Sequence, residues 1–153
     1  MSEEILEQNT NSDSLGEPII EFRGVSKTYQ TGTHALEDVN IQINKGEFVF
    51  VVGSSGAGKS TFMKLIIREE KANTGIIKVN GFNLTKMPRK QVPMLRRTMG
   101  IVFQDFRLIP TMNVFDNVAF AMHVVGKSGR EVRREVTNAL SKVGLGDKAR
   151  SMP

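Results

Sequence analysis

Residues 48–60 read FVFVVGSSGAGKS, an apolar run that passes directly into a glycine-rich loop. Apolar β-branched and aromatic side chains on both faces predict that residues 47–52 form a buried strand covered on each side. Residues 53–60 match the pattern G-x-x-x-x-G-K-S/T in full, and residues 59–68 carry apolar side chains at helical spacing. A buried strand, a glycine-rich loop and a helix in this order predict a phosphate-binding loop and an α/β fold.

The loop is expected to bind the phosphates of a nucleoside triphosphate. Its glycines let successive backbone N–H groups turn inward around a phosphate, and a helix that begins near Gly58 adds the positive end of its dipole. Lys59 supplies a mobile charge for the β- and γ-phosphates, Ser60 a hydroxyl ligand for Mg²⁺, and Thr61 a donor to the α-phosphate. The predicted binding residues are Gly53, Ser54, Ser55, Gly56, Ala57, Gly58, Lys59, Ser60 and Thr61.

Two other classes of phosphate-loop protein can be tested on the sequence. A GTPase needs D-x-x-G and N-K-x-D segments downstream of the loop, and neither occurs there. A small-molecule kinase remains possible on the loop alone.

Charge is unevenly distributed along the 153 residues. Residues 1–17 hold five acidic side chains and no basic ones, so we expect a disordered acidic tail there. The rest of the chain holds 21 basic and 11 acidic residues, a net charge of +10 that indicates an anionic partner. A nucleic acid is not expected, because no aromatic residues interleave the basic cluster of Lys86, Arg89, Lys90, Arg96 and Arg97.

Several classes are excluded by what the composition lacks. With no cysteine, the chain has no disulfide framework, thiolate zinc site or cysteine nucleophile. The longest uninterrupted aliphatic or aromatic stretch is residues 48–52, far short of the roughly 18–20 residues that span a bilayer. Acidic residues follow Met1 where a signal peptide would be basic or apolar. We therefore expect a chain that is not secreted and does not itself cross a membrane.

The remaining sequence predicts further strands and helices by periodicity and turn chemistry. Strands are expected at residues 19–25, 35–43, 75–79 and 99–103, with Asn80-Gly81 as a hairpin turn. Helices are expected at residues 88–97, 113–125 and 128–143. Pro93 should limit the first of these to the residues after it, and Ser128 opens the last with a capping box.

Four segments outside the loop resemble the N-terminal part of an ABC-type ATPase. They are VSKTY at 25–29, ALEDVN at 35–40, TGIIKVNG at 74–81 and RRTMGIVFQ at 96–104. The resemblance covers residues 18–153 almost continuously. It implies an α/β phosphate-loop NTPase core, an antiparallel β subdomain and the start of a helical subdomain.

The resemblance also implies roles for two residues and for ATP with Mg²⁺ as the bound cofactors. Tyr29 would stack on adenine. Gln104 would contact Mg²⁺, together with Ser60, and the attacking water. Asp105 is not expected to hold metal, because Gln104 interrupts the apolar run before it and Arg107 follows closely. His34 and His123 are expected to be structural, because neither has an acidic or serine partner at recognisable spacing.

Within the family, residues 102–110 and 113–121 are similar to the cell-division ATPases of the FtsE type. Lipoprotein-release and macrolide-export ATPases are the alternative. The resemblance implies an FtsX-like membrane protein and a second copy of the ATPase as partners. It also implies a peripheral location at the cytoplasmic face of the cell membrane.

Three elements of a complete ABC ATPase do not occur in this sequence: the signature segment, an apolar strand ending in Asp-Glu, and a switch histidine. We therefore expect residues 18–153 to be the N-terminal part of the domain, truncated before the signature segment. No catalytic residue is assigned, and hydrolysis is expected only in a full-length parent. A non-catalytic nucleotide-binding module is the competing interpretation.

Overall fold

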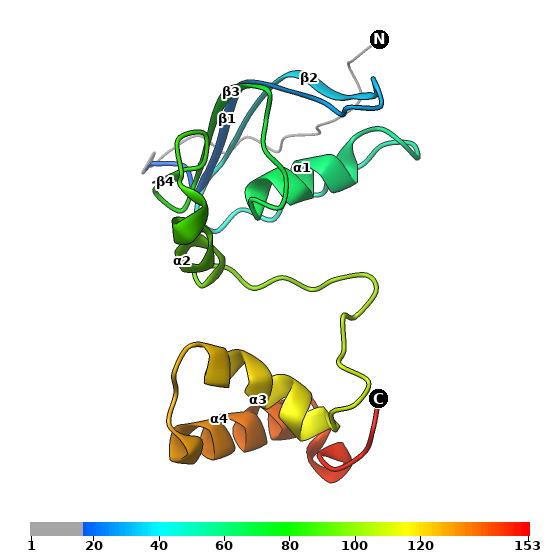
Figure 1. Ribbon diagram of the computed structural model, residues 1–153, viewed down its shortest axis with the longest axis vertical. Coiled ribbons are helices and arrows are strands. Elements are labelled where there is room, and N and C mark those ends of the chain that lie inside the picture. The colour runs from blue at the N-terminus through cyan, green and yellow to red at the C-terminus, as the bar shows by residue number, and fades with distance from the viewer. Residues whose placement is uncertain (1–16) are drawn as a thin grey trace. The chain divides into compact units, whose positions relative to one another are not determined.

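The computed structural model describes residues 17–153, so all but one residue of the predicted acidic tail lies outside the described residues. The chain divides into two compact units, with the boundary in the sequence between Gly100 and Ile101, and each is described by itself. The elements of both units are labelled in Figure 1.

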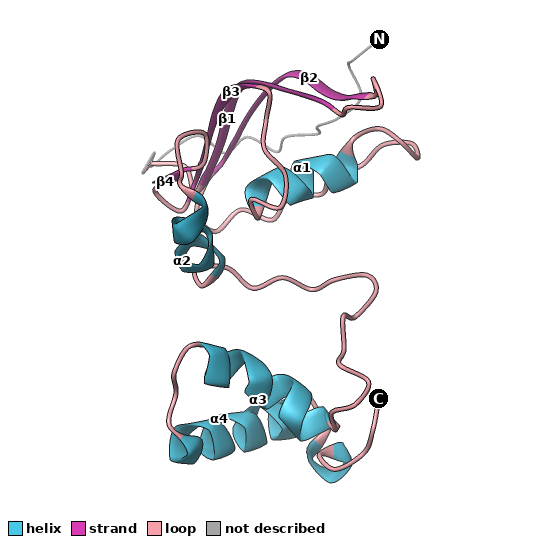
Figure 2. Cartoon of the chain, in the orientation of Figure 1, coloured by secondary structure: helices cyan, strands magenta, loops and turns pink. Residues whose placement is uncertain are grey.

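The first unit is built on a four-stranded sheet with strand order β2-β1-β3-β4, in which every neighbouring pair is antiparallel (Figure 2). The strands are β1 (Ile20–Thr28), β2 (His34–Ile43), β3 (Thr74–Val79) and β4 (Phe82–Asn83). Asn80 and Gly81 join the last two with φ angles of 48° and 79°, as a tight hairpin turn requires. The antiparallel sheet and its Asn-Gly hairpin are confirmed.

Helix α1 (Lys59–Ile66) packs its apolar face on this sheet. The ring of Phe62 contacts that of Phe22 on β1, with ring centroids 4.7 Å apart. Leu65 is fully buried beside them. The apolar residues whose spacing predicted this helix therefore form the face that the helix buries. Burying a side chain of this size stabilises the fold by about 1.5–3 kcal/mol.

A short helical segment follows the sheet, formed by η1 (Arg89–Gln91) and α2 (Val92–Arg96). The predicted helix is present, but its expected start after Pro93 is wrong. Proline occupies the first turn of α2, where its missing N–H has no intrahelical partner to lose.

The second unit is a pair of helices, α3 (Val114–Val124) and α4 (Gly129–Lys142), followed by η2 (Gly146–Lys148). Its core consists of Ala119 from α3 and of Val132, Val136 and Leu140 from α4. The three α4 residues recur every four positions and therefore form one face. Both predicted helices are confirmed. No helix within residues 17–153 has the length and apolarity needed to cross a bilayer.

The expected strands at residues 47–52 and 99–103 are wrong, because both segments are irregular. A strand exists only where a neighbouring strand takes its backbone hydrogen bonds. Within residues 17–153 no segment forms such a ladder with either one. In the first segment Phe48 and Phe50 are 83% and 71% exposed, the opposite of the double burial that its composition predicted.

The N-terminus of α4 carries the predicted capping box. The Glu131 N–H donates to the Ser128 hydroxyl at 3.4 Å, and the Glu131 carboxylate accepts from the Ser128 N–H at 3.1 Å. Bonds from the Ser128 hydroxyl and N–H, and then the nearby Lys127 ammonium, lower the pKa of Glu131 from 4.5 to about 2. The folded helix therefore favours the charged carboxylate.

This capping box predicts an acid-sensitive helix. A carboxylate with a lowered folded-state pKa stabilises the fold above its unfolded pKa, and that stabilisation disappears as the pH falls from 4.5 through about 2. Far-UV circular dichroism should show a helicity loss in this window that is smaller in Glu131→Gln than in wild type. Ser128→Ala should destabilise the unit by about 0.5–2 kcal/mol near neutral pH. Glu135→Gln, on the same helix, is the control, and an acid response equal to that of Glu131→Gln would contradict the assignment.

Candidate functional site

The glycine-rich loop connects residue 52 to the first turn of α1, and its conformation depends on glycine. Gly56 and Gly58 adopt φ angles of 83° and 88°, a region that side chains disfavour. A Cβ atom on Gly58 would lie 2.3 Å from the carbonyl oxygen of Ala35 on β2, so the close approach of loop and sheet leaves no room for one. At Gly56 nothing lies within 4 Å of the same position. The loop is thus anchored at one end and open near its middle.

The N-terminus of α1 suits an anion. Gly58 is its N-cap residue and supplies no side-chain cap, and the first turn contains no acidic residue. The first N–H groups of a helix have no intrahelical acceptor, and the helix dipole places partial positive charge there. Ser60 is exposed in this turn, whereas Thr61 is buried. The backbone N–H groups of this turn and the Ser60 hydroxyl are donors of the kind that bind a phosphate.

The Lys59 side chain turns back across the loop. Its ammonium donates to the carbonyl oxygens of Gly53 and Ser54, each at 2.7 Å. Both contacts are with the loop's own backbone, so the charge is held over the loop. An anion in the loop would meet this charge together with the helix N-terminus.

Tyr29 lies next to this loop, although it comes 32 residues before Thr61. Its hydroxyl and that of Thr61 are hydrogen-bonded at 3.2 Å. Its backbone N–H donates to the carbonyl of Thr33 at 2.9 Å, which fixes the turn after β1. The structure thus brings the predicted adenine-stacking residue into contact with the last of the predicted phosphate-binding residues.

Gln104 and Asp105 belong to the second unit, whereas the loop belongs to the first. Gln104 is exposed. Asp105 forms an ion pair with Arg107 at 3.4 Å. The role predicted for Gln104 stays a prediction.

Neither histidine lies in a catalytic arrangement. His34 contacts the Thr28 hydroxyl through Nδ1 at 3.3 Å, and His123 is exposed in the last turn of α3. Within residues 17–153 no three histidine or acidic side chains are grouped in a way that could hold a metal ion.

An apolar pocket lies between β2, α1 and the irregular segment before the loop. Its volume is only about 20 Å³, enough for one water molecule, and most of its lining is aliphatic. It cannot receive a nucleotide. Ala57, Gly58 and Lys59 of the loop form part of its lining.

Two residues beside Tyr29 were missed by the sequence analysis. The Lys27 ammonium lies 4.9 Å from the centroid of the Tyr29 ring, and the Glu70 carboxylate accepts from it at 2.8 Å. Tyr29 directly follows β1 and Lys27 lies two positions before it, so the spacing of the two residues was the available signal. Nothing in the sequence marked Glu70.

Comparison with known proteins gives the context of this site. Residues 36–153 match the model of a protein family described as ABC transporter. The cell division ATP-binding protein FtsE of Streptococcus pneumoniae is 49% identical over 135 residues, or 88% of this chain. The FtsE proteins of Bacillus subtilis and Escherichia coli are 47% and 44% identical over the same length. The chain spans only 59% to 61% of the length of these relatives.

Solved structures show the same similarity. The dimeric ATP-binding cassette MJ0796, bound to ADP and Pi, is 31% identical with a TM-score of 0.79. The match covers 88% of this chain and 61% of the cassette. CbiO1 of Clostridium perfringens, part of the ABC transporter complex cbiONQ, is 29% identical with a TM-score of 0.77, over 90% of this chain and 55% of its own. The predicted fold class, an α/β cassette with an antiparallel sheet, is confirmed.

Proposed function

The chain belongs to the ABC transporter family, and from this premise we propose that it is an ATP-binding subunit of an FtsE-like system acting in bacterial cell division. The observation that carries the proposal is the loop of residues 53–60, with its glycine-dependent conformation and uncapped helix N-terminus. The hydrogen bond between Tyr29 and Thr61, beside this loop, supports Tyr29 as the residue that stacks on the base.

The loop residues fit the triphosphate of ATP. The open position at Gly56 and the N–H groups at the start of α1 suit phosphate oxygens. Lys59 would exchange its two carbonyl acceptors for the β- and γ-phosphates. When bound, Mg²⁺ would offset the charge of those phosphates. The exposed hydroxyl of Ser60 and the side chain of Gln104 are the groups proposed to hold it.

Tyr29 is proposed to bind the adenine. It is the single tyrosine, and the chain has no tryptophan, so its emission can be followed without interference. Base stacking on an aromatic side chain contributes about 1–3 kcal/mol. Thr61, whose hydroxyl holds the Tyr29 hydroxyl, would also donate to the α-phosphate. One hydroxyl would thus link the base side of the site to its phosphate side.

A membrane partner and a second copy complete the proposal. The FtsE relatives carry cell-division names, and the related cassette MJ0796 is dimeric. We therefore expect a peripheral position at the cytoplasmic face of the membrane, through an FtsX-like protein. Affinity purification of the tagged chain from bacterial membranes should recover that protein in the presence of ATP. Recovery of a lipoprotein-release or macrolide-export permease in its place would contradict the cell-division assignment.

Tyrosine emission tests the nucleotide site directly. If adenine stacks on Tyr29, ADP should change the emission of the chain at matched absorbance, because the base contacts the only fluorophore. Inorganic triphosphate should bind the loop and leave the emission nearly unchanged. Equal responses to the two ligands, or no response to either, would show that Tyr29 only packs.

A further inference from the structure

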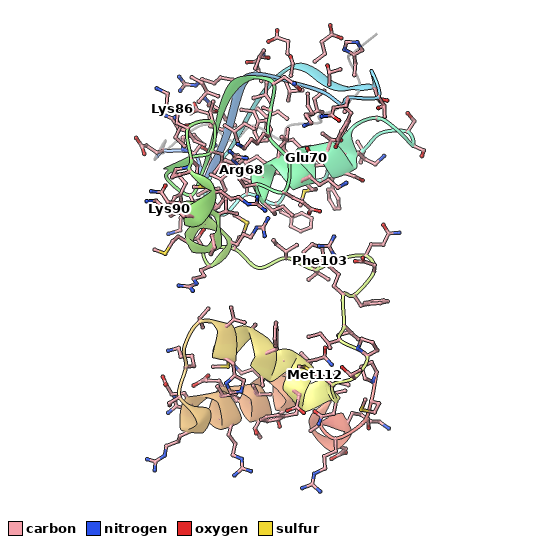
Figure 3. All side chains as sticks on the ribbon, viewed as in Figure 1. Arg68, Glu70, Lys86, Lys90, Phe103 and Met112 are labelled. Atoms are coloured by element: carbon pink, nitrogen blue, oxygen red, sulfur yellow. The ribbon has the colours of Figure 1, made fainter. Side chains whose placement is uncertain are left out.

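Lys27 is a buried cation near the end of β1. Its side chain is only 11% exposed, and its ammonium donates to the Glu70 carboxylate at 2.8 Å and to the Lys71 carbonyl at 2.9 Å. Both acceptors follow α1, and Figure 3 labels Glu70 next to that helix. The interaction therefore ties the end of β1 to the segment that leaves the predicted phosphate-binding helix.

Stability alone does not account for this ion pair. Removing the Lys27 ammonium from water, opposite a carboxylate that stays 33% exposed, carries a desolvation cost that their attraction often only offsets. Apolar residues of similar volume at such positions are frequently as stable or more stable. What the pair does achieve is a fixed position for one positive charge. That position is 4.9 Å from the centroid of the Tyr29 ring, within the range of a cation–π interaction.

Tyr29 is thereby held at three points. The Lys27 ammonium lies over one face of its ring, Thr61 binds its hydroxyl, and Thr33 binds its backbone N–H. A ring held in this way has one face covered by the ammonium. It has also lost most of its rotational freedom before any ligand arrives, so binding does not incur that entropy cost.

We propose that Lys27, anchored by Glu70, is a positioning residue for base recognition. Lys27 occupies one face of the Tyr29 ring and so directs the base of the nucleotide to the opposite face. The ammonium also draws electron density toward itself, which improves the free face for stacking on an electron-rich purine. The inference rests on the proposed function, because it requires Tyr29 to contact the base.

Paired ligands separate base recognition from phosphate binding. ATP contacts both sides of the site, whereas inorganic triphosphate contacts only the loop, so the ratio of their affinities measures the contribution of the base. Lys27→Met keeps an unbranched stem and removes the ammonium. Without the ammonium the Tyr29 side chain must be ordered when the nucleotide binds, and this entropy cost should lower ATP affinity roughly three- to tenfold. Triphosphate affinity should stay within about twofold of wild type.

A matched control exists on the same sheet. Lys78 on β3 also forms an ion pair with a buried carboxylate, that of Glu21, at 3.4 Å. Glu21 lies near the start of β1, roughly 20 Å from Lys27 at the usual rise per residue. Lys78→Met should therefore leave both affinities unchanged. Lys27→Arg keeps a cation opposite Glu70 and should recover part of the lost ATP affinity.

A spectroscopic measurement reports the ring itself. Without nucleotide, acrylamide should quench Tyr29 emission more strongly in Lys27→Met than in wild type, because the covered face becomes accessible. Glu70→Gln keeps the shape of the acceptor and removes its charge. It should show the lower ATP affinity and the stronger quenching of Lys27→Met, each to a smaller extent. If Lys27→Met does not fold, Glu70→Gln alone decides between the outcomes.

The outcomes distinguish this inference from the proposed function. Wild-type protein that binds ATP no more tightly than triphosphate would overturn base recognition by Tyr29, and this inference with it. Wild-type protein that prefers ATP, with Lys27→Met showing the same preference and quenching, would overturn the inference alone. Equal losses for ATP and triphosphate in Lys27→Met, or equal losses in Lys78→Met, would also overturn it, because they indicate a general structural effect.

Discussion

Replacing Lys59 by alanine is expected to weaken ATP binding by roughly ten- to a hundredfold, because a charge-assisted contact contributes about 1.5–3 kcal/mol. The ammonium of Lys59 is the charge that the structure holds over the loop, through the carbonyl oxygens of Gly53 and Ser54. On binding, the phosphates would replace those neutral acceptors with charged ones. The dependence of binding on Mg²⁺ should fall as well.

Titration calorimetry with ATP, with and without Mg²⁺, is the measurement. Lys64→Ala is the matched control, because Lys64 lies in the last turn of the same helix, at the end away from the loop. Its ATP affinity should stay within about twofold of wild type. Circular dichroism should show that both variants retain their helices. Unchanged ATP affinity in Lys59→Ala would contradict the assignment of the loop.

Gly58→Ala is expected to cause the largest loss of stability among single changes in the loop. A side chain at a φ of 88° carries backbone strain of about 1–3 kcal/mol. The new Cβ would also lie 2.3 Å from the Ala35 carbonyl oxygen, and relieving such an overlap by backbone movement costs about 1–3 kcal/mol more. The sum, about 2–6 kcal/mol, is a large part of the stability of a typical domain.

Gly32→Ala is the control for strain alone. Gly32 has a φ of 83°, and no atom lies within 4 Å of the position a Cβ would occupy. Urea denaturation should therefore give a clearly larger decrease in the free energy of unfolding for Gly58→Ala than for Gly32→Ala. Gly58→Ala should also bind ATP more weakly, because relieving the overlap moves the start of α1. Equal losses of stability would mean that the loop does not pack on β2 as described.

Local sequence was sufficient for the elements whose bonds and contacts are themselves local. The capping box of Ser128 and Glu131 lies within one helical turn, so four residues define it. The Asn80-Gly81 hairpin depends on two residues that tolerate positive φ. Helix α1 makes its hydrogen bonds within itself, and the octet before it was recognisable from spacing alone. These predictions are confirmed as structure, because each element contains its own hydrogen-bond partners.

Local sequence was not sufficient for the strands. Residues 47–52 and 99–103 have the composition of buried strands, yet both are irregular in the structure. A strand takes its hydrogen bonds from another segment, and composition carries no information about whether that segment is adjacent. The strands that were predicted correctly are β1, β2 and β3, and β1 pairs with each of the other two.

The arrangement around Tyr29 was decided by tertiary structure alone. Tyr29 was selected through a family resemblance, but its contact with Thr61 spans 32 positions, and the bond from Lys27 to Glu70 spans 43. No local pattern encodes either contact, because both form where β1 and the two ends of α1 come together. Lys27 would be an ordinary strand lysine in the sequence. It becomes a buried charge over an aromatic ring because packing removes its water and leaves it the Glu70 carboxylate and one backbone carbonyl as acceptors.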